Sequence, residues 1–437
     1  MASEARFLRA DRLQTRWDFI DLEALLPSDH RVRIVWAFVE NLDLSAFYDQ
    51  IRSREGEPGR PPPDPAVLLA LWLYAMTEDV DSARELDRLA ERDLAYRWIA
   101  GGVPLNHHGL SDFRVQNGEL FNRLLTESAT ALIAEGLVSL AEVSIDGTKV
   151  RANASRESFK TADRLEQIEA AVERRLAALR AETERDPEAS SRRKRAAQER
   201  AAREVKERAE RARAALERLR AEKEKRAKQH PGEKANKKSE PKASISDADA
   251  RPMQFRDGAV RPGYNAQIAA TANTGVILSV EMTDRRNDSG LAAPMVEDLV
   301  CRYGKTPEML LIDTNYATSE DIAALAEHPA GPVTVYAPAP SERENISARG
   351  LASRQRKRAR EPESVKEWRR RMATQAGQQV YRGRKLIERV NAHLKNHGFG
   401  FVPVRGLLKA QAVALLHALA NNLLAGYRLR AKVAWSV

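Results

Sequence analysis

Two stretches of the sequence decide the fold: Val143-Ser144-Ile145-Asp146-Gly147 and Met309-Leu310-Leu311-Ile312-Asp313. Each is a short apolar run typical of a buried strand, and each closes with an aspartate that turn-forming residues follow. We expect each carboxylate to project from a sheet edge, where functional sites often lie. A lone aspartate at a strand end is more often a turn residue or a helix cap, so a third element is needed to define a site.

The elements around these two stretches predict the fold class. Residues 264–282 are expected to form two strands joined at Asn273-Thr274-Gly275, residues 292–303 and 318–327 are expected helices, and residues 333–336 a further buried strand. The chain order is therefore three strands, a helix, a strand, a helix and a strand, followed later by a helix around Glu388. This order predicts a mixed α/β sheet in an RNase H-like catalytic core.

The helix around Glu388 supplies the third element. On a helical wheel, four polar residues from position 381 to position 395 fall within about 60° of each other. Apolar residues cluster on the opposite side, so we expect that side to pack on the sheet and the polar stripe to face a cleft or solvent. A solvated charged face is the ordinary alternative. The polar stripe consists of Tyr381, Arg384, Glu388 and Lys395, and the apolar side of Leu386, Ile387, Val390 and Leu394.

The first part of the chain, residues 1–137, is expected to be an all-α N-terminal domain. Residues 67–76 predict a buried helix after a proline-rich stretch, and Ser82 with Glu85 matches a capping box that opens a helix through about Arg97. Ser111 is expected to cap a further helix that ends at Gly136. The catalytic domain is then expected at residues 138–160 and 244–437.

Two charged insertions are expected within that catalytic domain. Residues 161–243 are rich in Arg, Lys, Glu and Ala, and predict a helical hairpin or coiled-coil arm with a break at Asp186-Pro187. Residues 338–380 form a basic insertion before the Glu388 helix. The overall expectation is an α/β RNase H-like core with an all-α N-terminal domain and a helical, coiled-coil-like insertion.

The amino-acid composition indicates which class of partner the protein binds. The 437 residues include 72 Lys and Arg against 62 Asp and Glu, a formal net charge of +10 that favours a polyanionic partner such as DNA. The single cysteine, Cys301, excludes a disulfide framework or a multi-cysteine zinc site. No signal peptide is visible, and the longest apolar run we identified, residues 66–76, is shorter than the roughly 18 residues of a membrane span. A cytoplasmic protein without a membrane partner is expected.

The spacing of Tyr381, Arg384, Glu388 and Lys395 resembles the Y-x2-R-x3-E-x6-K signature of bacterial insertion-sequence transposases of the DDE type. The resemblance covers most of the chain. Further segments are similar to this family, and those at 247–251 and 263–267 are similar to its insertion-sequence 1182 group. These segments are Arg60-Pro61-Pro62, Ser82-Ala83-Arg84-Glu85, Leu110-Ser111-Asp112-Phe113-Arg114, Ser144-Ile145-Asp146-Gly147-Thr148, Asp247-Ala248-Asp249-Ala250-Arg251 and Gly263-Tyr264-Asn265-Ala266-Gln267.

The resemblance implies a metal-dependent reaction on DNA. Asp146, Asp313 and Glu388 would be the catalytic carboxylates, and oxygen ligands of this kind suit Mg²⁺ or Mn²⁺, with two ions expected. Arg384 and Lys395 carry no acceptor atom and are expected to contact DNA phosphates, while Tyr381 would stack on a base or bond a phosphate. The implied partners are the terminal inverted repeats and the target DNA, with a homodimer on paired ends in the bacterial cytoplasm, associated with the nucleoid.

Two positions depart from the family pattern. The family usually has Asp-x-Gly-Tyr at the second aspartate, whereas this chain has Asp313-Thr314-Asn315-Tyr316. Asn tolerates left-handed backbone angles, so we expect the turn to be kept. A Val-Asp pair common in the family is replaced by Thr271-Ala272-Asn273, which lacks the carboxylate.

Other interpretations remain open at the level of sequence. An RNase H-like structure-selective nuclease would need no transposon ends, and a catalytically silent DNA-binding regulator would need no carboxylates. Asp288 follows the third strand and is interpreted as a surface turn more readily than as part of the site. The pair His107-His108 lacks a nearby Cys or third His and does not predict a metal site.

Overall fold

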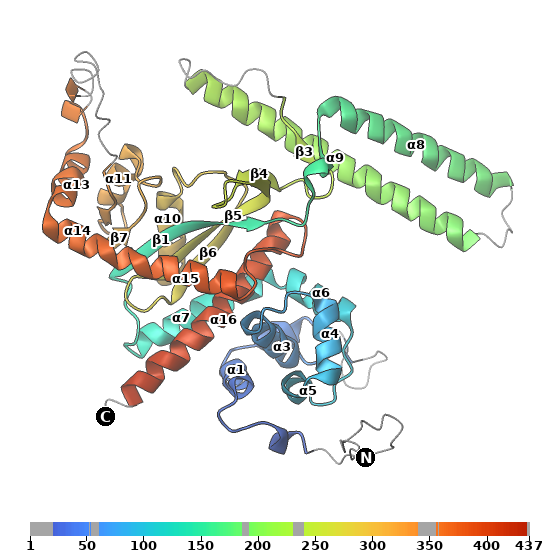
Figure 1. The fold of residues 1–437 in the computed structure, drawn as a ribbon, viewed down its shortest axis with the longest axis horizontal. Coiled ribbons are helices and arrows are strands. Elements are labelled where there is room, and N and C mark those ends of the chain that lie inside the picture. The colour runs from blue at the N-terminus through green and yellow to red at the C-terminus, as the bar shows by residue number, and fades with distance from the viewer. Residues whose placement is uncertain are drawn as a thin grey trace, which may run out of the picture.

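The computed structural model describes residues 21–51, 53, 61–185, 192–229, 240–339, 355–356 and 358–434. A mixed sheet lies at its centre (Figure 1). Strand β1 (Glu142–Arg151) pairs antiparallel with β5 (Val260–Thr271), which pairs antiparallel with β6 (Ile277–Thr283). On the other side of β1, β7 (Met309–Leu311) and then β8 (Thr334–Tyr336) run parallel to it. This order agrees with the RNase H-like core expected from the sequence.

The two sheet faces pack against different helices because side chains alternate along each strand. Val143, Ile145 and Ala269 share a core with α10 (Ala292–Tyr303), α11 (Ser319–Ala326) and α13 (Glu363–Ala373). Ala266, Ile268 and Ala270 share another core with α15 (Lys385–Asn396) and α16 (Leu407–Ala434). Asp146 pairs with Ile268 across the ladder, so its side chain leaves the sheet on the α15 face.

Strand β1 is longer than the sequence predicted, and Asp146 lies inside it rather than at its end. The strand continues because its residues pair with β5 as far as Arg151 opposite Gly263. Gly147 does not form a turn. A Cβ atom at this position would lie 2.4 Å from Oδ1 of Asp288, so the glycine permits the close approach of that carboxylate.

The N-terminal helices form one unit beside the sheet. They are α1 (Arg31–Glu40), α2 (Ser45–Asp49), α3 (Pro65–Thr77), α4 (Ala83–Arg92), α5 (Leu94–Ala100), α6 (His107–Gln116) and α7 (Gly118–Ala134). Ser82 caps α4 as predicted, by accepting from the Glu85 amide, but Asp93 ends that helix early by capping α5. Asn106, not Ser111, caps α6, because its side chain accepts from the Gly109 amide while Ser111 lies within the helix.

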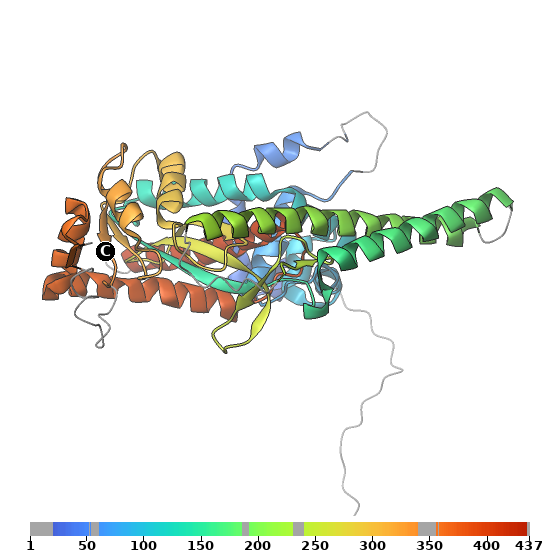
Figure 2. The same cartoon turned by 90° about the horizontal axis from the view of Figure 1, so that it is seen from above.

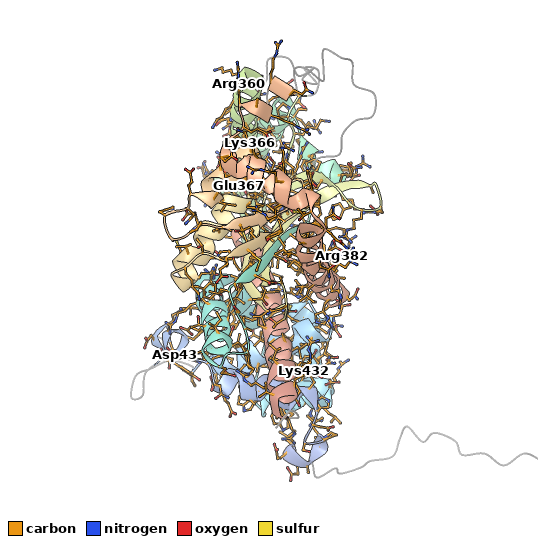
Figure 3. All side chains as sticks on the ribbon, turned by 90° about the vertical axis from the view of Figure 1, so that its left-hand side faces the viewer. Asp43, Arg360, Lys366, Glu367, Arg382 and Lys432 are labelled. Atoms are coloured by element: carbon orange, nitrogen blue, oxygen red, sulfur yellow. The ribbon has the colours of Figure 1, made fainter. Side chains whose placement is uncertain are left out.

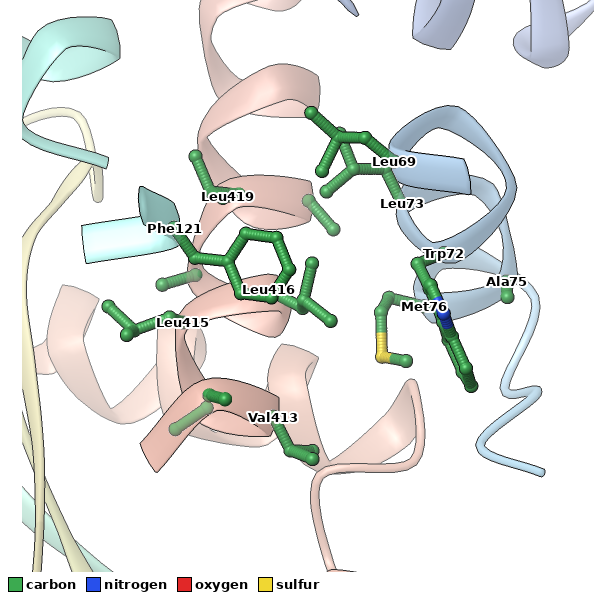
Figure 4. Close-up of a cluster of buried hydrophobic side chains, with 14 of the residues drawn as sticks. Leu69, Trp72, Leu73, Ala75, Met76, Phe121, Val413, Leu415, Leu416 and Leu419 are labelled. Carbon is green, nitrogen blue, oxygen red and sulfur yellow. The ribbon is translucent and has the colours of Figure 1, made fainter. Parts of the chain in front are cut away.

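Helix α16 joins the N-terminal helices to the sheet. Its leucines, including Leu415, Leu416 and Leu419, pack between α3 and Phe121 of α7 (Figure 4). This helix is long and apolar enough to span a membrane, but 72% of its most apolar window is buried inside the protein, as in a core helix. The segment expected as residues 1–137 and the catalytic segment therefore share one continuous core.

The charged insertion forms a hairpin of two helices, α8 (Ala162–Arg185) and α9 (Arg192–Gln229), that extends away from the body (Figures 1 and 2). The predicted break at Asp186-Pro187 lies outside the described residues. Leu165 of α8 is buried against alanines of α9, Ala209 and Ala212 among them. Small side chains allow close helix contact, which is why the scarcity of large apolar residues in α9 does not prevent pairing. At its base, β2 (Phe159–Lys160) pairs with β3 (Ala243–Ser244).

The basic insertion at 338–380 is described only in part, because residues 340–354 and 357 lie outside the described residues. Its described part contains α13 and α14 (Gln375–Tyr381). Charged side chains project from this side of the molecule, including Arg360, Lys366 and Arg382 (Figure 3). Trp368 of α13 is buried and donates from its indole to the Ala337 carbonyl at 3.0 Å, which fixes the helix beside β8.

Candidate active site

The parallel register of β1 and β7 brings two predicted site residues together. The last paired residues are Ser144 and Leu311, and Asp146 and Asp313 each follow two residues later. Neighbouring strands lie about 4.8 Å apart, so the two aspartates start from adjacent backbones where β7 has ended. The site edge therefore arises from the end of β7, not from the end of β1.

Arg384 connects this edge to α15. One terminal nitrogen of Arg384 donates to Oδ1 of Asp146 at 2.7 Å, and the other donates to Oε1 of Glu388 at 2.7 Å. Arg384 and Asp146 are each only 8% exposed, whereas the Glu388 side chain is 54% exposed. The guanidinium thus stands between two of the predicted catalytic carboxylates, with Glu388 on the solvent side.

The segment that carries Arg384 differs from the single helix expected from position 381 onwards. Helix α14 ends at Tyr381, a 3₁₀ turn η3 follows (Arg382–Arg384), and α15 begins at Lys385. A 3₁₀ turn has about three residues per turn, so it rotates the residues before it relative to those after it. The expectation that the whole polar stripe faces a cleft or solvent is wrong for Arg384, whose side chain is buried against the sheet.

Asn391 is a site residue that the sequence analysis missed. Its side-chain nitrogen donates to Oδ2 of Asp146 at 2.7 Å, and the residue is 2% exposed. Arg384 and Asn391 together therefore hold both oxygens of the Asp146 carboxylate. A signal was present, because Asn391 is a polar residue beside the apolar positions 387, 390 and 394, where a polar side chain requires a partner.

Asp288 also belongs to this neighbourhood, contrary to its interpretation as a surface turn. Its Oδ1 accepts from Asn265 at 2.7 Å and from Gln267 at 2.9 Å, both on β5. Lys149 Nζ lies 3.9 Å from the same oxygen. Because Gly147 leaves room for it, Asp288 contributes a negative charge close to Asp146, with which it interacts electrostatically.

The electrostatics of the site are those of a buried carboxylate with a compensating cation. Burial raises the pKa of Asp146. The positive charge of Arg384 and the hydrogen bond from Asn391 oppose that rise, whereas the negative charges of Asp288 and Asp313 add to it. Burial alone would lower the pKa of Arg384, but the nearby Asp146 and the other acidic groups outweigh it and raise this pKa. The excess of negative charge attracts cations, and the Arg384 guanidinium is hydrogen-bonded to Asp146.

The two remaining predicted residues lie at opposite ends of this segment. Tyr381 ends α14 and is partly buried against the core that contains α13, and burial raises its pKa. Lys395 lies in the last turn of α15 and lines a separate cavity together with residues 147–149 of β1. Tyr381 is therefore near the carboxylates, and Lys395 lies beyond them along the helix.

The donor atoms suit a hard divalent cation in their chemistry. Carboxylate oxygens of Asp146, Asp313 and Glu388 are the ligands that Mg²⁺ and Mn²⁺ prefer. The buried Oδ1 of Asn391 and Nε of Arg384 have no hydrogen-bond partner within the described part of the chain, so the polar interior is not fully satisfied. Among the described residues, however, no three Asp, Glu, His or Cys side chains are grouped closely enough to hold a metal ion.

Comparison with known families gives two matches. A family model described as "Transposase DDE domain" matches residues 239–423, and one described as "Transposase domain (DUF772)" matches residues 20–116. The first match contains Asp313 and α15 but begins after Asp146. No curated protein and no solved structure matches the chain. The DDE match implies an RNase H-like core, and the two matches together support an insertion-sequence transposase of the DDE type.

Proposed function

We propose that this protein is a transposase of the insertion-sequence 1182 group that cuts DNA at the terminal inverted repeats of its own element and joins the ends to target DNA. The observation that supports the proposal is that Arg384 donates to both Asp146 and Glu388, beside the end of β7, which Asp313 follows. The three carboxylates come from segments far apart in the chain: Asp146 lies on β1, Asp313 follows the neighbouring strand β7, and Glu388 shares the Arg384 guanidinium with Asp146. DNA is the expected partner of the net positive charge.

The three carboxylates are proposed to hold Mg²⁺ or Mn²⁺, with two ions in the complete site. Bound ions would activate the attacking hydroxyl and stabilise the leaving oxygen of a phosphodiester. Asp146 is suited to a central position because it is buried and oriented by Asn391. Glu388 is suited to join from the solvent side because α15 leaves it half exposed.

Arg384 is proposed to exchange partners when the site is filled. Its guanidinium neutralises Asp146 and Glu388 in the present arrangement, and a divalent ion shared by these carboxylates would make that contact unnecessary. A guanidinium released in this way matches the geometry of a phosphate group. The predicted DNA contact of Arg384 then applies to the DNA-bound state, with Tyr381 and Lys395 as further DNA contacts from the same segment.

The experiment uses DNA carrying the inverted repeats that flank the gene, with Mg²⁺ or Mn²⁺. Wild-type protein should cut at the repeat ends and join them to a second DNA. Asp146→Ala, Asp313→Ala and Glu388→Gln should each abolish cleavage while circular dichroism and DNA binding stay near wild type. Glu320→Gln removes an exposed carboxylate from α11 and should leave cleavage unchanged.

Each alternative gives a different result in this assay. A structure-selective nuclease would cut branched DNA regardless of the repeats and would not join ends. A silent regulator would bind the repeats without cutting them in either metal. Full cleavage by Glu388→Gln in Mg²⁺ would remove Glu388 from the proposed ligands. We expect paired ends to be held by a homodimer in the cytoplasm, at the nucleoid.

A further inference from the structure

A cationic cavity lies beside the carboxylates, and Lys395 is the one of its lining residues that belongs to the DNA contacts proposed above. Its volume is about 390 Å³, and it opens between three elements: β1 just after Asp146, the turn joining β4 (Arg251–Gln254) to β5, and the last turn of α15. Its lining includes four cationic side chains and one carboxylate. These are Lys149, Arg256, Arg261, Lys395 and Asp257.

The one carboxylate among the lining residues, Asp257, already forms an ion pair. Oδ2 of Asp257 accepts from a terminal nitrogen of Arg261 at 2.6 Å, so these two charges compensate each other. Lys149 has only the distant carboxylate of Asp288, at 3.9 Å, and its Nζ is buried without a hydrogen-bond partner in the described part of the chain. Local compensation therefore leaves an excess of positive charge in the cavity.

Arg256 and Lys395 are the two cations without a pair. Neither makes an ion pair or a side-chain hydrogen bond within the described residues. The pKa of Lys395 is lowered, first by burial and then by the charge of Arg256, whereas Asp146 opposes the shift. Two cations that line one cavity and repel each other, with no ion pair to a carboxylate among the described residues, are stabilised by an anion placed there.

The β4–β5 hairpin presents Arg256 in a defined position. Phe255 donates from its amide to the Ala259 carbonyl at 2.9 Å, and Gly258 closes the turn with φ +78°. Arg261 lies over the Phe255 ring at 5.7 Å, which supports the turn from the β5 side. The hairpin projects from the sheet (Figure 2), and its residues 254–257 line the cavity opposite Lys395 of α15.

We propose that this cavity binds a backbone phosphate of the DNA strand next to the phosphodiester that is cut, with Arg256 and Lys395 as its ligands and the β4–β5 hairpin as a clamp. The inference rests on the proposed function, since it names the DNA subsite of that reaction. A phosphodiester has the properties that this cavity requires of a ligand. It is an anion with two exposed oxygens, and the chain on either side of it can enter and leave an open cavity. Lys149, which also lines the cavity, adds electrostatic attraction for the phosphate at longer range.

The test measures the affinity of repeat-end DNA by fluorescence anisotropy over a series of salt concentrations. Arg256→Gln and Lys395→Gln should each weaken binding several-fold, and each should flatten the slope of log affinity against log salt by about one unit. Lys305→Gln removes an exposed positive charge before β7, at the opposite end of that strand from Asp313, and should change neither quantity. Unchanged slopes in both cavity variants would overturn the proposal.

A second measurement locates the phosphate. The cut site is first mapped with wild-type protein, and each neighbouring phosphate is then replaced by an uncharged methylphosphonate. Wild type should lose affinity at one phosphate flanking the cut, and Arg256→Gln should lose less at that same phosphate, because only Lys395 remains to contact it. If Arg256→Gln remains as sensitive as wild type at every position, the cavity does not hold the backbone.

The outcomes separate this inference from the proposed function. Wild-type protein that neither binds nor cuts repeat-end DNA contradicts the function itself. Wild-type protein that cuts such DNA, while the cavity variants bind and cut it normally, contradicts only the subsite. Inorganic phosphate and a deoxynucleoside monophosphate serve as further probes: thermal stabilisation by these anions that Arg256→Gln removes, with unchanged DNA affinity, would assign the cavity to a small phosphate and overturn the DNA proposal.

Discussion

Two buried regions of this molecule differ in the kind of contact that holds them together: one is packed from apolar side chains and the other from charged and polar ones. The interior between α3, α7 and α16 consists mainly of leucines and aromatic rings, and Phe121 there packs against Phe113 at 5.7 Å between ring centroids. The interior between β1 and α15 contains the buried side chains of Asp146, Arg384 and Asn391, and the latter two each donate a hydrogen bond to Asp146. Apolar burial stabilises without direction, whereas the polar cluster costs desolvation and holds its parts in one geometry. The first interior serves the fold, and the second holds the side chains of the candidate site in one geometry.

The largest stability effect is expected in the apolar interior. Phe121→Ala should lower the free energy of unfolding by about 3–5 kcal/mol, because it removes a fully buried ring and leaves a cavity. Guanidinium denaturation followed by circular dichroism measures the change. Leu408→Ala, at a position of α16 that is 85% exposed, serves as control and should stay within about 0.5 kcal/mol. Similar losses in the two variants would show that the α7–α16 interior does not dominate stability.

In the polar interior, the free energy of unfolding should fall more when one of the two charges is removed than when both are removed. Arg384→Gln leaves Asp146 buried without its cation, and we expect a loss of about 3 kcal/mol. Adding Asp146→Asn should recover much of that loss, and a double-mutant cycle measures the coupling. Mg²⁺ should raise the melting temperature of Arg384→Gln more than that of Arg384→Gln/Asp146→Asn. Strictly additive losses would show that the two side chains act independently.

A smaller effect on stability is expected from a histidine buried in the apolar interior. Burial lowers the pKa of His417 to about 3, and its ring lies 4.9 Å from that of Phe399. An unfolded histidine has a pKa of about 6.5, so the unfolded state binds the proton first and stability falls as pH drops from about 6.5 towards 3. The slope contributed by this group is about 1.4 kcal/mol per pH unit. His417→Leu should remove that part of the acid sensitivity, as measured by denaturation between pH 6 and pH 4; an unchanged slope would contradict the assignment.

The smallest stability effect is expected from the arm, which belongs to neither interior. The pairing of β2 with β3 brings its ends together, so a short Gly/Ser linker can replace residues 162–242. Its own small core is largely separate from the other two, so the unfolding of the body should change by less than about 1 kcal/mol. We expect single-end binding and nicking to persist and two-end complexes to weaken, as measured by gel shift and light scattering. Two-end complexes at wild-type levels would exclude the arm from assembly.

Local patterns were sufficient for much of the sheet and for part of the site. Helix α10 has the predicted bounds, the turn before β6 contains Gly275 with φ +74°, and the two aspartates were recognised from the apolar runs before them. These features depend on residues a few positions apart. The extent of β1 was underestimated because its second half is stabilised by pairing with β5, which lies more than a hundred residues further along the chain.

The sequence by itself determined the chain order of five of the six strands of the sheet, the net charge, the oxygen-rich donor set and the spacing of residues 381–395. Only the tertiary structure decided that Arg384 lies between Asp146 and Glu388, that Asn391 orients Asp146, and that Asp288 is a neighbour and not a surface turn. The physical reason is that these contacts join groups distant in sequence: Arg384 and Asp146 are 238 positions apart. Periodicity specifies which face of an element is buried, but the partner on that face is chosen by how the whole chain packs.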